Sequence, residues 1–368
     1  MKILYLAPKF DYGDQKRGLS FEHYNFFDTF YNTGNEIIYF DYLDILKKTD
    51  KKNMNRLLYD LFLQEKPDMV FVFLFENELN QEIMDKISKS GRTITLCWFA
   101  DDHWRFENYS RYWASRFNWS VTTDINSVEK YKLTGNKNVI LTQWGCNHFR
   151  YNVLDLPDAC DTSFVGQKYG NREEVIDMIR DSGIEVHTRG QGWPMGRADQ
   201  DEMIRIFNQT AVNLNIANAS MGISSGLLSL LDRNLLYRPI VRRFWKKIRS
   251  VFLQGKMQPL RQIKGRNFEI PGCGGFLLTD YVPGLENYYN IGKDIICYNN
   301  IQDMIDKIEY FLKNENERQE IALRGYKVTC DRHTYVHRFN EIFKEVGLGH
   351  TFSLEKTEGI VREITEEV

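Results

Sequence analysis

The feature that most constrains the fold of this chain is an alternation of short apolar runs with amphipathic segments. The runs of the first half are rich in β-branched and aromatic residues, as strands are. They read KILYLAP, EIIYFDY, DMVFVFLF, TITLCWFA, WSVTTD and NVILTQW. Helices are predicted between them, one from Ser20 as N-cap to a stop at Gly34, and others at 55–64, 78–90 and 127–133. Strands that alternate with helices form a parallel sheet covered on both faces.

The same alternation restarts in the second half, with DTSFVGQ, IEVHTRG, AVNLNIA, GGFLLTD and DIICYN as strands. Helices are predicted at 171–182, 199–209 and 301–312, followed by a helix-rich end at 316–346. A chain of 368 residues is long enough for two cores. The pattern therefore predicts an α/β chain with two Rossmann-like domains whose parallel sheets face a cleft, the default place for an active site.

The predicted boundaries put the first domain at residues 1–155 and the second at 156–346. The remainder, 347–368, is a polar tail, expected to be either a docking helix or partly disordered.

Charge and composition narrow the location and the partners. The 48 basic residues nearly balance the 50 acidic ones, so no global field draws the chain to nucleic acid, and none is expected as a partner. No signal peptide and no apolar run of about 18 residues is visible, and the cysteines show no CxxC pair. The expected location is cytoplasmic, with the inner face of the membrane as an option.

A basic insert at about 221–262 interrupts the alternation. Cations mix with Phe244, Trp245 and Phe252 over 238–252, so an amphipathic helix there would suit an anionic membrane. A solvated face, or a lining for an acidic acceptor, is the alternative. The peripheral membrane contact is thus predicted for Arg238 to Phe252.

The segment KGRNFEIPGCGGFLLTDYVPGLEN, at 264–287, carries the most chemistry. A short helix is expected to begin near Arg266 and to end in GCGG, which contains Gly274. Lys264 and Arg266 are placed to hold a diphosphate, on which negative charge grows as a glycosidic bond breaks. Glu269 is placed to accept hydrogen bonds from ribose hydroxyls. Alternatively, GCGG only allows tight packing and Glu269 is an ordinary acid of a first helical turn.

These residues resemble a known family. GRNFEIPGCGGFLLTDYVPGLENYY, IGKDIICYNN and RQEIALRGYKVTCDRHTYVHRF are similar to the C-terminal domain of CgeB-like (spore-maturation-type) glycosyltransferases. TSFVGQKYGNR, WFADDHWRF and VTTDINSVEKYKLTG resemble the same family further upstream. The resemblance implies a GT-B fold, donor binding by the second domain with Glu269 on the ribose, and transfer that needs neither metal nor cofactor. Many relatives carry a second glutamate where this chain has Arg261, so the resemblance does not fix a retaining reaction.

Acidic residues follow the strand TITLCWFA and mark the acceptor side. At the carboxyl end of a parallel strand, Asp101 or Asp102, with His103 beside them, would reach the cleft as a general base or an acceptor-binding group. A helix cap or a salt bridge to Arg105 is the alternative, and the sequence does not choose between the two aspartates.

Weaker candidates surround these two sites. Gly166 and Arg172, in GQKYGNR, are placed to reach a phosphate, and Trp193 to stack on the base, although a plain turn and core packing explain them as well. Three further candidates lie on the acceptor side: Gly13, Glu22 and His23. His333 and His337 are spaced like a metal pair but lack an acidic third ligand, so structural roles are favoured.

The sequence therefore predicts a glycosyltransferase that uses a nucleotide-sugar donor, with a UDP-sugar favoured, and a surface glycan, lipid-linked or protein acceptor. A nucleotide-sugar epimerase or hydrolase of the same fold, and a non-catalytic sugar-binding protein, are the alternatives.

Overall fold

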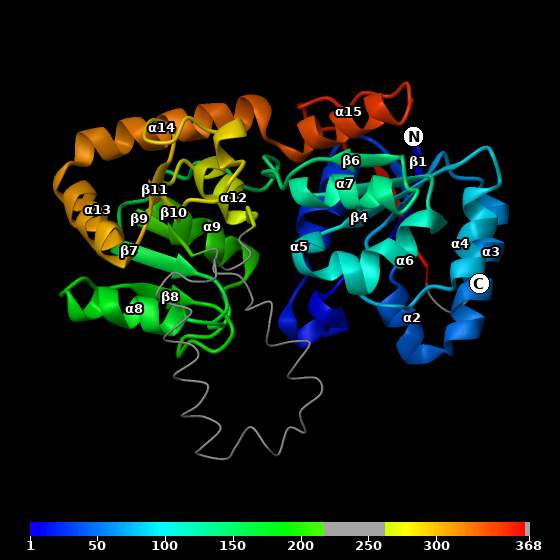
Figure 1. Cartoon of the computed structure of the whole chain (residues 1–368), viewed down its shortest axis with the longest axis horizontal. Coiled ribbons are helices and arrows are strands. Elements are labelled where there is room, and N and C mark those ends of the chain that lie inside the picture. The colour runs from blue at the N-terminus through cyan, green and yellow to red at the C-terminus, as the bar shows by residue number, and fades with distance from the viewer. Residues whose placement is uncertain (217–261, 365–368) are drawn as a thin grey trace, which may run out of the picture.

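The computed structural model describes residues 1–216 and 262–364, which form two halves that each contain a parallel sheet (Figure 1). The first sheet has the order β12-β2-β1-β3-β4-β5-β6 and the second has the order β11-β10-β9-β7-β8. The strands of the first sheet are β1 Lys2–Leu6, β2 Glu36–Phe40, β3 Met69–Val72, β4 Ile94–Phe99, β5 Trp119–Thr122, β6 Val139–Leu141 and β12 Ile360–Glu363. Those of the second are β7 Cys160–Val165, β8 His187–Arg189, β9 Thr210–Asn215, β10 Leu277–Asp280 and β11 Ile296–Tyr298. The predicted α/β fold with two parallel sheets is confirmed.

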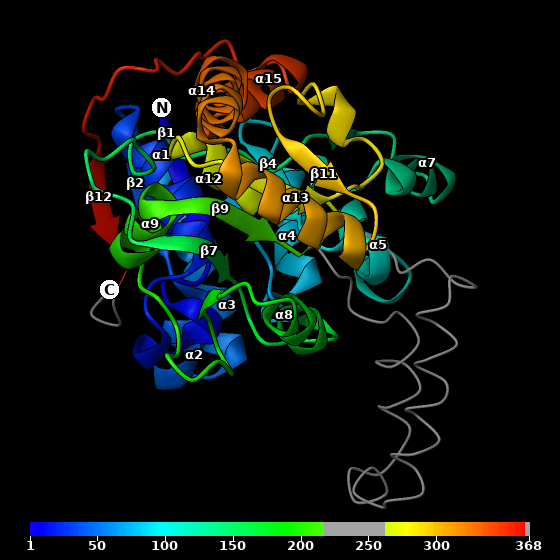
Figure 2. The same ribbon diagram turned by 90° about the vertical axis from the view of Figure 1, so that its left-hand side faces the viewer.

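Helices connect the strands of the first half and cover both faces of its sheet (Figure 2). They are the π-helix η3 His23–Phe27, α1 Asp28–Asn32, α2 Tyr42–Lys48, α3 Lys51–Glu65, α4 Gln81–Ser88, α5 Asp102–Arg105, the π-helix η4 Phe106–Ser110, α6 Arg111–Trp113 and α7 Ile125–Leu133. The side chains of Asp41, Asp50, Asn80 and Asp124 cap α2, α3, α4 and α7. Alternate residues of β1 enter opposite cores: Ile3 and Tyr5 pack on the η3–α1 side, and Leu4 on the α2–α4 side.

Helices also connect the strands of the second half. Its helices are α8 Arg172–Asp181, α9 Gln200–Gln209, α12 Arg266–Gly272, α13 Ile301–Lys313, α14 Glu315–Arg332 and α15 Tyr335–Glu345. Helix α12 lies between β9 and β10 in the chain. Residues 217–261, which precede this helix, lie outside the described ranges, and so does the predicted basic helix at 238–252. Among the helices that are described, none is long and apolar enough to cross a membrane.

The C-terminal end of the chain returns to the first half. Helix α15 packs on the first sheet, with the ring of Phe339 centred 4.3 Å from that of Phe30. Strand β12 then pairs in parallel with β2, and Ile364 N donates to Tyr39 O. The expectation of a docking helix or disorder for the tail was wrong over these residues, because IVRE meets the open edge of β2. The predicted domain boundaries stay a prediction.

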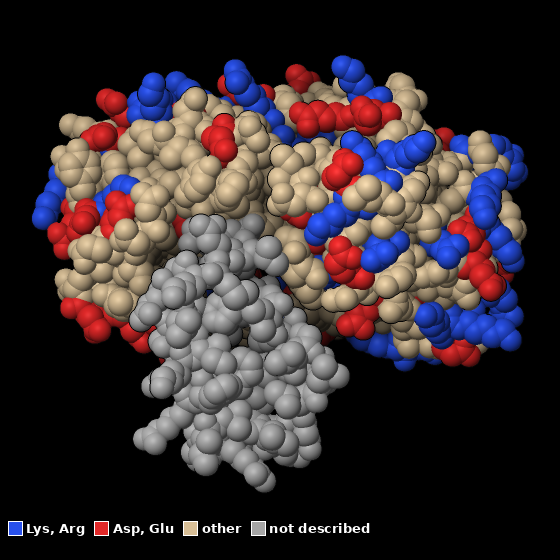
Figure 3. Space-filling view, viewed as in Figure 1, with Lys and Arg blue, Asp and Glu red and all other residues tan. Residues whose placement is uncertain are grey.

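The chain crosses between the halves twice, first near Cys146 and again at 333–335, and the two crossing segments lie side by side. Cys146 N donates to His333 O at 2.9 Å, and Tyr335 N donates to Cys146 O at 3.0 Å. On the face shown in Figure 3, basic and acidic side chains are intermixed over both halves, as the near-zero net charge suggests.

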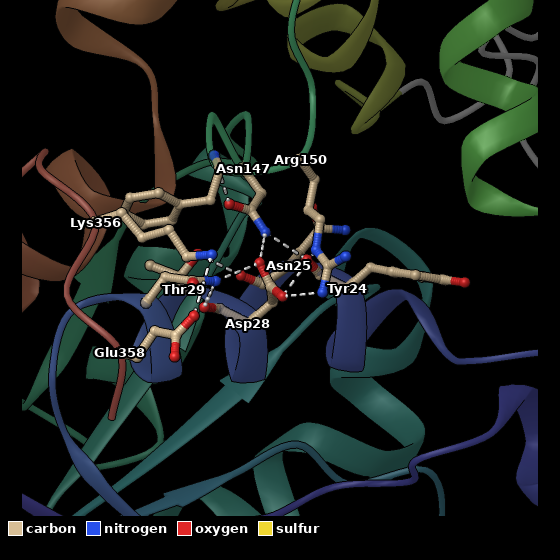
Figure 4. A network of polar contacts seen from close by, with 10 residues as sticks. Tyr24, Asn25, Asp28, Thr29, Asn147, Arg150, Lys356 and Glu358 are labelled. Atoms are coloured by element: carbon tan, nitrogen blue, oxygen red, sulfur yellow. Dashed lines mark hydrogen bonds and ion pairs between the residues drawn. The ribbon is translucent and has the colours of Figure 1, made fainter. Parts of the chain in front are cut away.

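A buried carboxylate fastens the first passage to the helix that follows β1 (Figure 4). Asp28 is 3% exposed and accepts hydrogen bonds from Asn32, Asn147 and Arg150, with Asn147 Nδ2 at 2.8 Å and Arg150 Nε at 2.8 Å. Asn147 Nδ2 also donates to Tyr24 O at 2.6 Å. This network holds the η3–α1 helix against the segment that leads into the second half.

We expect Asp28→Ala to lower the free energy of unfolding by about 2 kcal/mol, because hydrogen bonds to a charged group are lost and Asn147 Nδ2 keeps only its bond to Tyr24 O in the interior. Chemical denaturation would measure this. Asp44→Ala, which removes a surface pair with Lys48, is the control and should change stability by less than about 0.5 kcal/mol. Equal effects of the two variants would contradict the structural role of Asp28.

Candidate active site

Two adjoining cavities lie between the halves, at the carboxyl ends of the strands. The first, of about 400 Å³, is lined by residues that follow β1, β3 and β4 in the first half and β7 and β9 in the second. The second, of about 380 Å³, lies between the loop after β1 and the loops after β7 and β8. Asp11, Phe21, Val165, Gly166 and Arg266 line both cavities. The cleft predicted from the alternation therefore exists where parallel sheets place ligands.

Cations form the wall of the first cavity on the side of the second half. Lys264, Arg266 and Arg172 all line it. Burial lowers the pKa of Lys264, and its Nζ donates to Gln262 at 3.1 Å. The guanidinium of Arg172 donates to the carbonyls of Ile216, at 2.8 Å, and Gln167, at 3.0 Å. Arg172 and Lys264 are thus held by oxygen acceptors beside the cavity, where an anion would find positive charge.

Helix α12 begins at this wall, as the sequence predicts. Asn267 Oδ1 accepts from Lys264 N at 3.0 Å and so stabilises the turn before the helix. Arg266 pairs with Glu269 one turn along. Glu269 is fully buried and lines the second cavity. The structure therefore brings together the predicted group of Lys264, Arg266 and Glu269. Lys264 lines the first cavity, Glu269 lines the second, and Arg266 lines both.

Gly274 does not belong to this group. It follows the end of α12 with φ +73°, and a Cβ there would come within 2.9 Å of Val153 Cγ2. Gly274 lines neither of the two cavities. Its position does not support the predicted contact with the donor, because the glycine serves the turn at the far end of the helix.

Acidic side chains form the opposite wall. Glu22 and Asp101 line the first cavity beside Arg105, and Asp11 joins them at its border with the second. Burial raises the pKa of Glu22 to about 7, and the charges of Asp11 and Asp101 raise it further, against hydrogen bonds from its own backbone and Ser20. Such a carboxyl exchanges a proton near neutral pH, which is the property a general base needs.

The structure separates the two adjacent aspartates. Asp101 lines the cavity, whereas Asp102 is 1% exposed and accepts from the hydroxyl of Tyr131 at 2.8 Å. Burial raises the pKa of Asp102 to about 6, against hydrogen bonds from Ser110, Thr122 and Tyr131. Asp102 therefore packs into the core of the first half, and its predicted catalytic role is not supported by its position.

The two predicted histidines also lie outside the lining of the first cavity. Burial, followed by the charge of Lys264, lowers the pKa of His103 to about 4. His23 stacks on Phe27 with ring centres 4.5 Å apart, and burial lowers its pKa to about 4 as well. Both rings are therefore neutral at physiological pH, and their absence from the lining of either cavity does not support a role as the base.

The predictions for Gly166, Trp193 and Gly13 have different outcomes. Gly166 lines both cavities, as predicted for a phosphate-approaching loop. Trp193 is buried, packs against Phe164 and donates its indole N–H to Gly166 O at 2.9 Å, so it supports that loop from the core. Gly13 is buried against Leu43 with φ +68°, and the acceptor-side lining is supplied by its neighbours Asp11 and Tyr12. The positions of Trp193 and Gly13 therefore do not support base stacking by the one or cleft lining by the other.

His333 and His337 have structural partners. His333 Nε2 lies 2.7 Å from Tyr288 O, and His337 forms a capping box with Thr334 at the start of α15.

The sequence-based prediction missed Asp11, Asn25, Tyr151 and Gln200, which line the second cavity. Asp11 lies in the loop after β1, so its place beyond a strand's carboxyl end was a usable signal. The other three lie on helices and in the connecting segment, where only the tertiary arrangement brings them to the cleft.

Comparison with known proteins agrees with this geometry. The sequence model of a glycosyl transferase-like family matches residues 241–344. No curated protein matches the chain. HepE from Anabaena, solved with UDP and glucose, is 9% identical with a TM-score of 0.57, over 94% of this chain and 99% of that one. The chain has the GT-B fold.

Two further solved structures resemble it over most of their length. Sucrose-phosphate synthase from Thermosynechococcus elongatus is 7% identical, with a TM-score of 0.57, over 95% of this chain and 100% of that one. AviGT4, a glycosyltransferase involved in avilamycin A biosynthesis, is 9% identical, with a TM-score of 0.53, over 96% and 99%. At these identities the likeness is one of fold.

The raised pKa of Glu22 makes a prediction for stability. A carboxyl that binds its proton more tightly in the folded than in the unfolded state destabilises the folded protein when it ionises. Its contribution to the free energy of unfolding is therefore lost as pH rises from the unfolded pKa, 4.5, to the folded pKa, about 7. We expect Glu22→Gln to raise the melting temperature relative to the unmodified protein, by a margin that widens from pH 5 to pH 7 and is constant above. Differential scanning calorimetry would show it.

Glu129→Gln, at an exposed position on α7, is the matched control and should show no such widening. A constant difference between Glu22→Gln and the unmodified protein at all pH values would mean that the Glu22 carboxyl does not titrate near neutrality.

Proposed function

We propose that the protein is a metal-independent glycosyltransferase of the CgeB-like type that transfers a sugar from a UDP-sugar to an acceptor hydroxyl. One observation carries this proposal. Lys264, Arg266 and Arg172 of the second half line the same cavity as Glu22 and Asp101 of the first half, where Arg105 lies beside the two acids. The solved complexes of HepE with UDP and with UDP-glucose support the choice of nucleotide.

The cations would hold the donor diphosphate. As the bond to the sugar breaks, the electron pair leaves with the diphosphate, whose negative charge grows. Lys264 and Arg266, together with the start of α12, stabilise that charge without a metal. The backbone of Gly166 lines both cavities and could approach the diphosphate there, and a Cβ at this position would also meet the ring of Phe164 at 2.7 Å.

The acids would act on the acceptor. Glu22, as a carboxylate, accepts the proton of the acceptor hydroxyl while the oxygen bonds to the anomeric carbon of the sugar. Burial is the main cause of the raised pKa of Glu22, and the charge of Asp101 adds to it; Asp101 also lies where it can bind further hydroxyls. A direct displacement of this kind inverts the anomeric configuration, which is consistent with Arg261 in place of the second glutamate.

Nucleotide binding tests the cationic wall. We expect the protein to bind UDP more tightly than GDP, dTDP, ADP or CMP in isothermal titration calorimetry. Lys264→Ala should raise the Kd for UDP about tenfold or more, because a charge-assisted bond to phosphate is lost. Lys293→Ala, an exposed lysine of the same half, is the control and should leave the Kd unchanged. Failure of the unmodified protein to bind any nucleoside diphosphate would refute the proposal.

The pH dependence of turnover tests the acidic wall. With water as a slow acceptor, we expect the release of UDP from UDP-glucose to rise with pH and to level off above about 7, as Glu22 loses its proton. Glu22→Gln should lower kcat about 10²-fold or more and remove the pH-dependent rise, with the Kd for UDP unchanged. Asp101→Asn should move the rise to lower pH, because a negative charge beside Glu22 is removed.

If Glu22→Gln releases UDP from UDP-glucose as fast as the unmodified protein does, Glu22 is not the base. Equal rates with and without every acceptor offered would favour the hydrolase alternative.

A further inference from the structure

The loop after β1 holds an exposed aromatic ring at the first cavity in a strained backbone conformation. Tyr12 lines that cavity and is 56% exposed. Its backbone has φ +53° and ψ +26°, in the left-handed region. Residues other than glycine are uncommon there, because the Cβ crowds the neighbouring backbone. The loop thus keeps a bulky, largely exposed side chain at a position where glycine would be easier.

The rest of the loop imposes this conformation. Phe10 forms an antiparallel bridge with Leu19, which closes the loop. Gly13 N donates to Phe10 O at 2.8 Å, and Lys47 Nζ donates to Gly13 O. Backbone strain persists only where the surroundings impose it, and it is concentrated at active sites and ligand-binding sites. The conformation of Tyr12 therefore indicates a functional use of its side chain.

Tyr12 and Phe75 together form an aromatic corner in the first half. Both line the first cavity, and their ring centres lie 5.0 Å apart with the planes at 86°. Arg17 lies over the Tyr12 ring, with Cζ 4.5 Å from the ring centre. Arg17 Nε in turn donates to Asp11 at 2.8 Å. The aromatic corner is thus held in place before a ligand binds, which lowers the entropy that binding costs.

Carboxyl groups that can bind hydroxyls lie close to the aromatic corner. Arg105 Nη2 donates to Phe75 O at 2.9 Å, and Arg105 N donates to Asp101 O at 2.9 Å, so Arg105 connects Phe75 to the start of α5. The side chain of Asp101 does not cap that helix, and it lines the cavity together with Glu22. The first half therefore presents aromatic rings and carboxyl groups to one cavity.

We infer that the acceptor is a carbohydrate, with one sugar ring packed in the aromatic corner and its hydroxyls at Asp101 and Glu22. This inference rests on the proposed function, because it takes the first half as the acceptor side. The C–H groups on a sugar ring carry partial positive charge and pack against the negative face of an aromatic ring. The hydroxyls at the rim of the sugar donate to carboxylates. An alkyl chain would fill the corner but leave the carboxylates without partners.

Saccharide binding to the UDP-loaded protein tests the inference. Saturation-transfer difference NMR would compare methyl glucoside, methyl galactoside and methyl N-acetylglucosaminide with octanol, an alcohol without a sugar ring. We expect at least one glycoside to bind, with the strongest saturation on its ring C–H groups. If no glycoside binds, or if octanol alone binds, the inference is overturned, and the proposed function stands as long as UDP binds. Absence of UDP binding to the unmodified protein would overturn both proposals.

Tyr12→Gly separates the function of the ring from a structural role. We expect the melting temperature to stay the same or rise, because glycine adopts a positive φ without strain. The Kd for the glycoside should rise about tenfold with the loss of the ring contact, and the Kd for UDP should not change. Tyr12→Phe keeps both the ring and the strain and should bind the glycoside like the unmodified protein.

Tyr112→Ala is the matched control, because this tyrosine of the first half is 58% exposed and lines neither cavity. It should leave both Kd values unchanged. If Tyr12→Gly lowers the melting temperature and binds the glycoside normally, Tyr12 is a structural residue and the inference is overturned. Equal weakening of glycoside binding in Tyr112→Ala and Tyr12→Gly would overturn it as well, because the effect would not belong to the aromatic corner.

Discussion

The position of the cleft follows from two parallel sheets that present their carboxyl ends to each other. In the first sheet, the segments after β1 and β4 bring Glu22 and Asp101 to that edge, and in the second, β7, β9 and the start of α12 bring Gly166, Arg172 and Lys264. Neither half has the complete set, so the chemistry exists only while the halves are held together. The hydrogen bonds between Cys146 and the segment 333–335, and the return of α15 and β12 to the first half, supply that constraint.

The environment of Glu22 shows how the fold produces a reactive group from an ordinary one. Ser20 ends the loop after β1, with its hydroxyl donating to Pro8 O at 2.7 Å and accepting from His23 N at 3.0 Å. Helix η3 then begins beneath the cavity, and the network of Asp28, Asn147 and Arg150 anchors its continuation. Glu22 is thereby fixed at a partly desolvated position near Asp11 and Asp101, which is the cause of its raised pKa.

The sequence was sufficient for the features that depend on local pattern. The two strand–helix alternations, the start of α12 at Arg266 and the cap at Ser20 follow from periodicity and capping chemistry, and the structure has them. The pattern does not show where a side chain points. Asp101 and Asp102 are adjacent, yet a half-turn at the start of α5 sends one to the cleft and the other to Tyr131. Trp193 and Gly274 belong to a core and a turn that only the tertiary packing reveals, and IVRE forms a strand because an edge of β2 is open to it.

The central claim is that the donor diphosphate lies on the cations of the second half, opposite Glu22 and Asp101 of the first. A crystal structure of the protein with UDP tests it most directly. The account predicts the diphosphate within hydrogen-bonding distance of Lys264 and Arg266, the uridine on the second half, and the outer phosphate directed toward Glu22. A uridine in the first cavity beside Asp101, or a nucleotide bound away from the cleft, would contradict it.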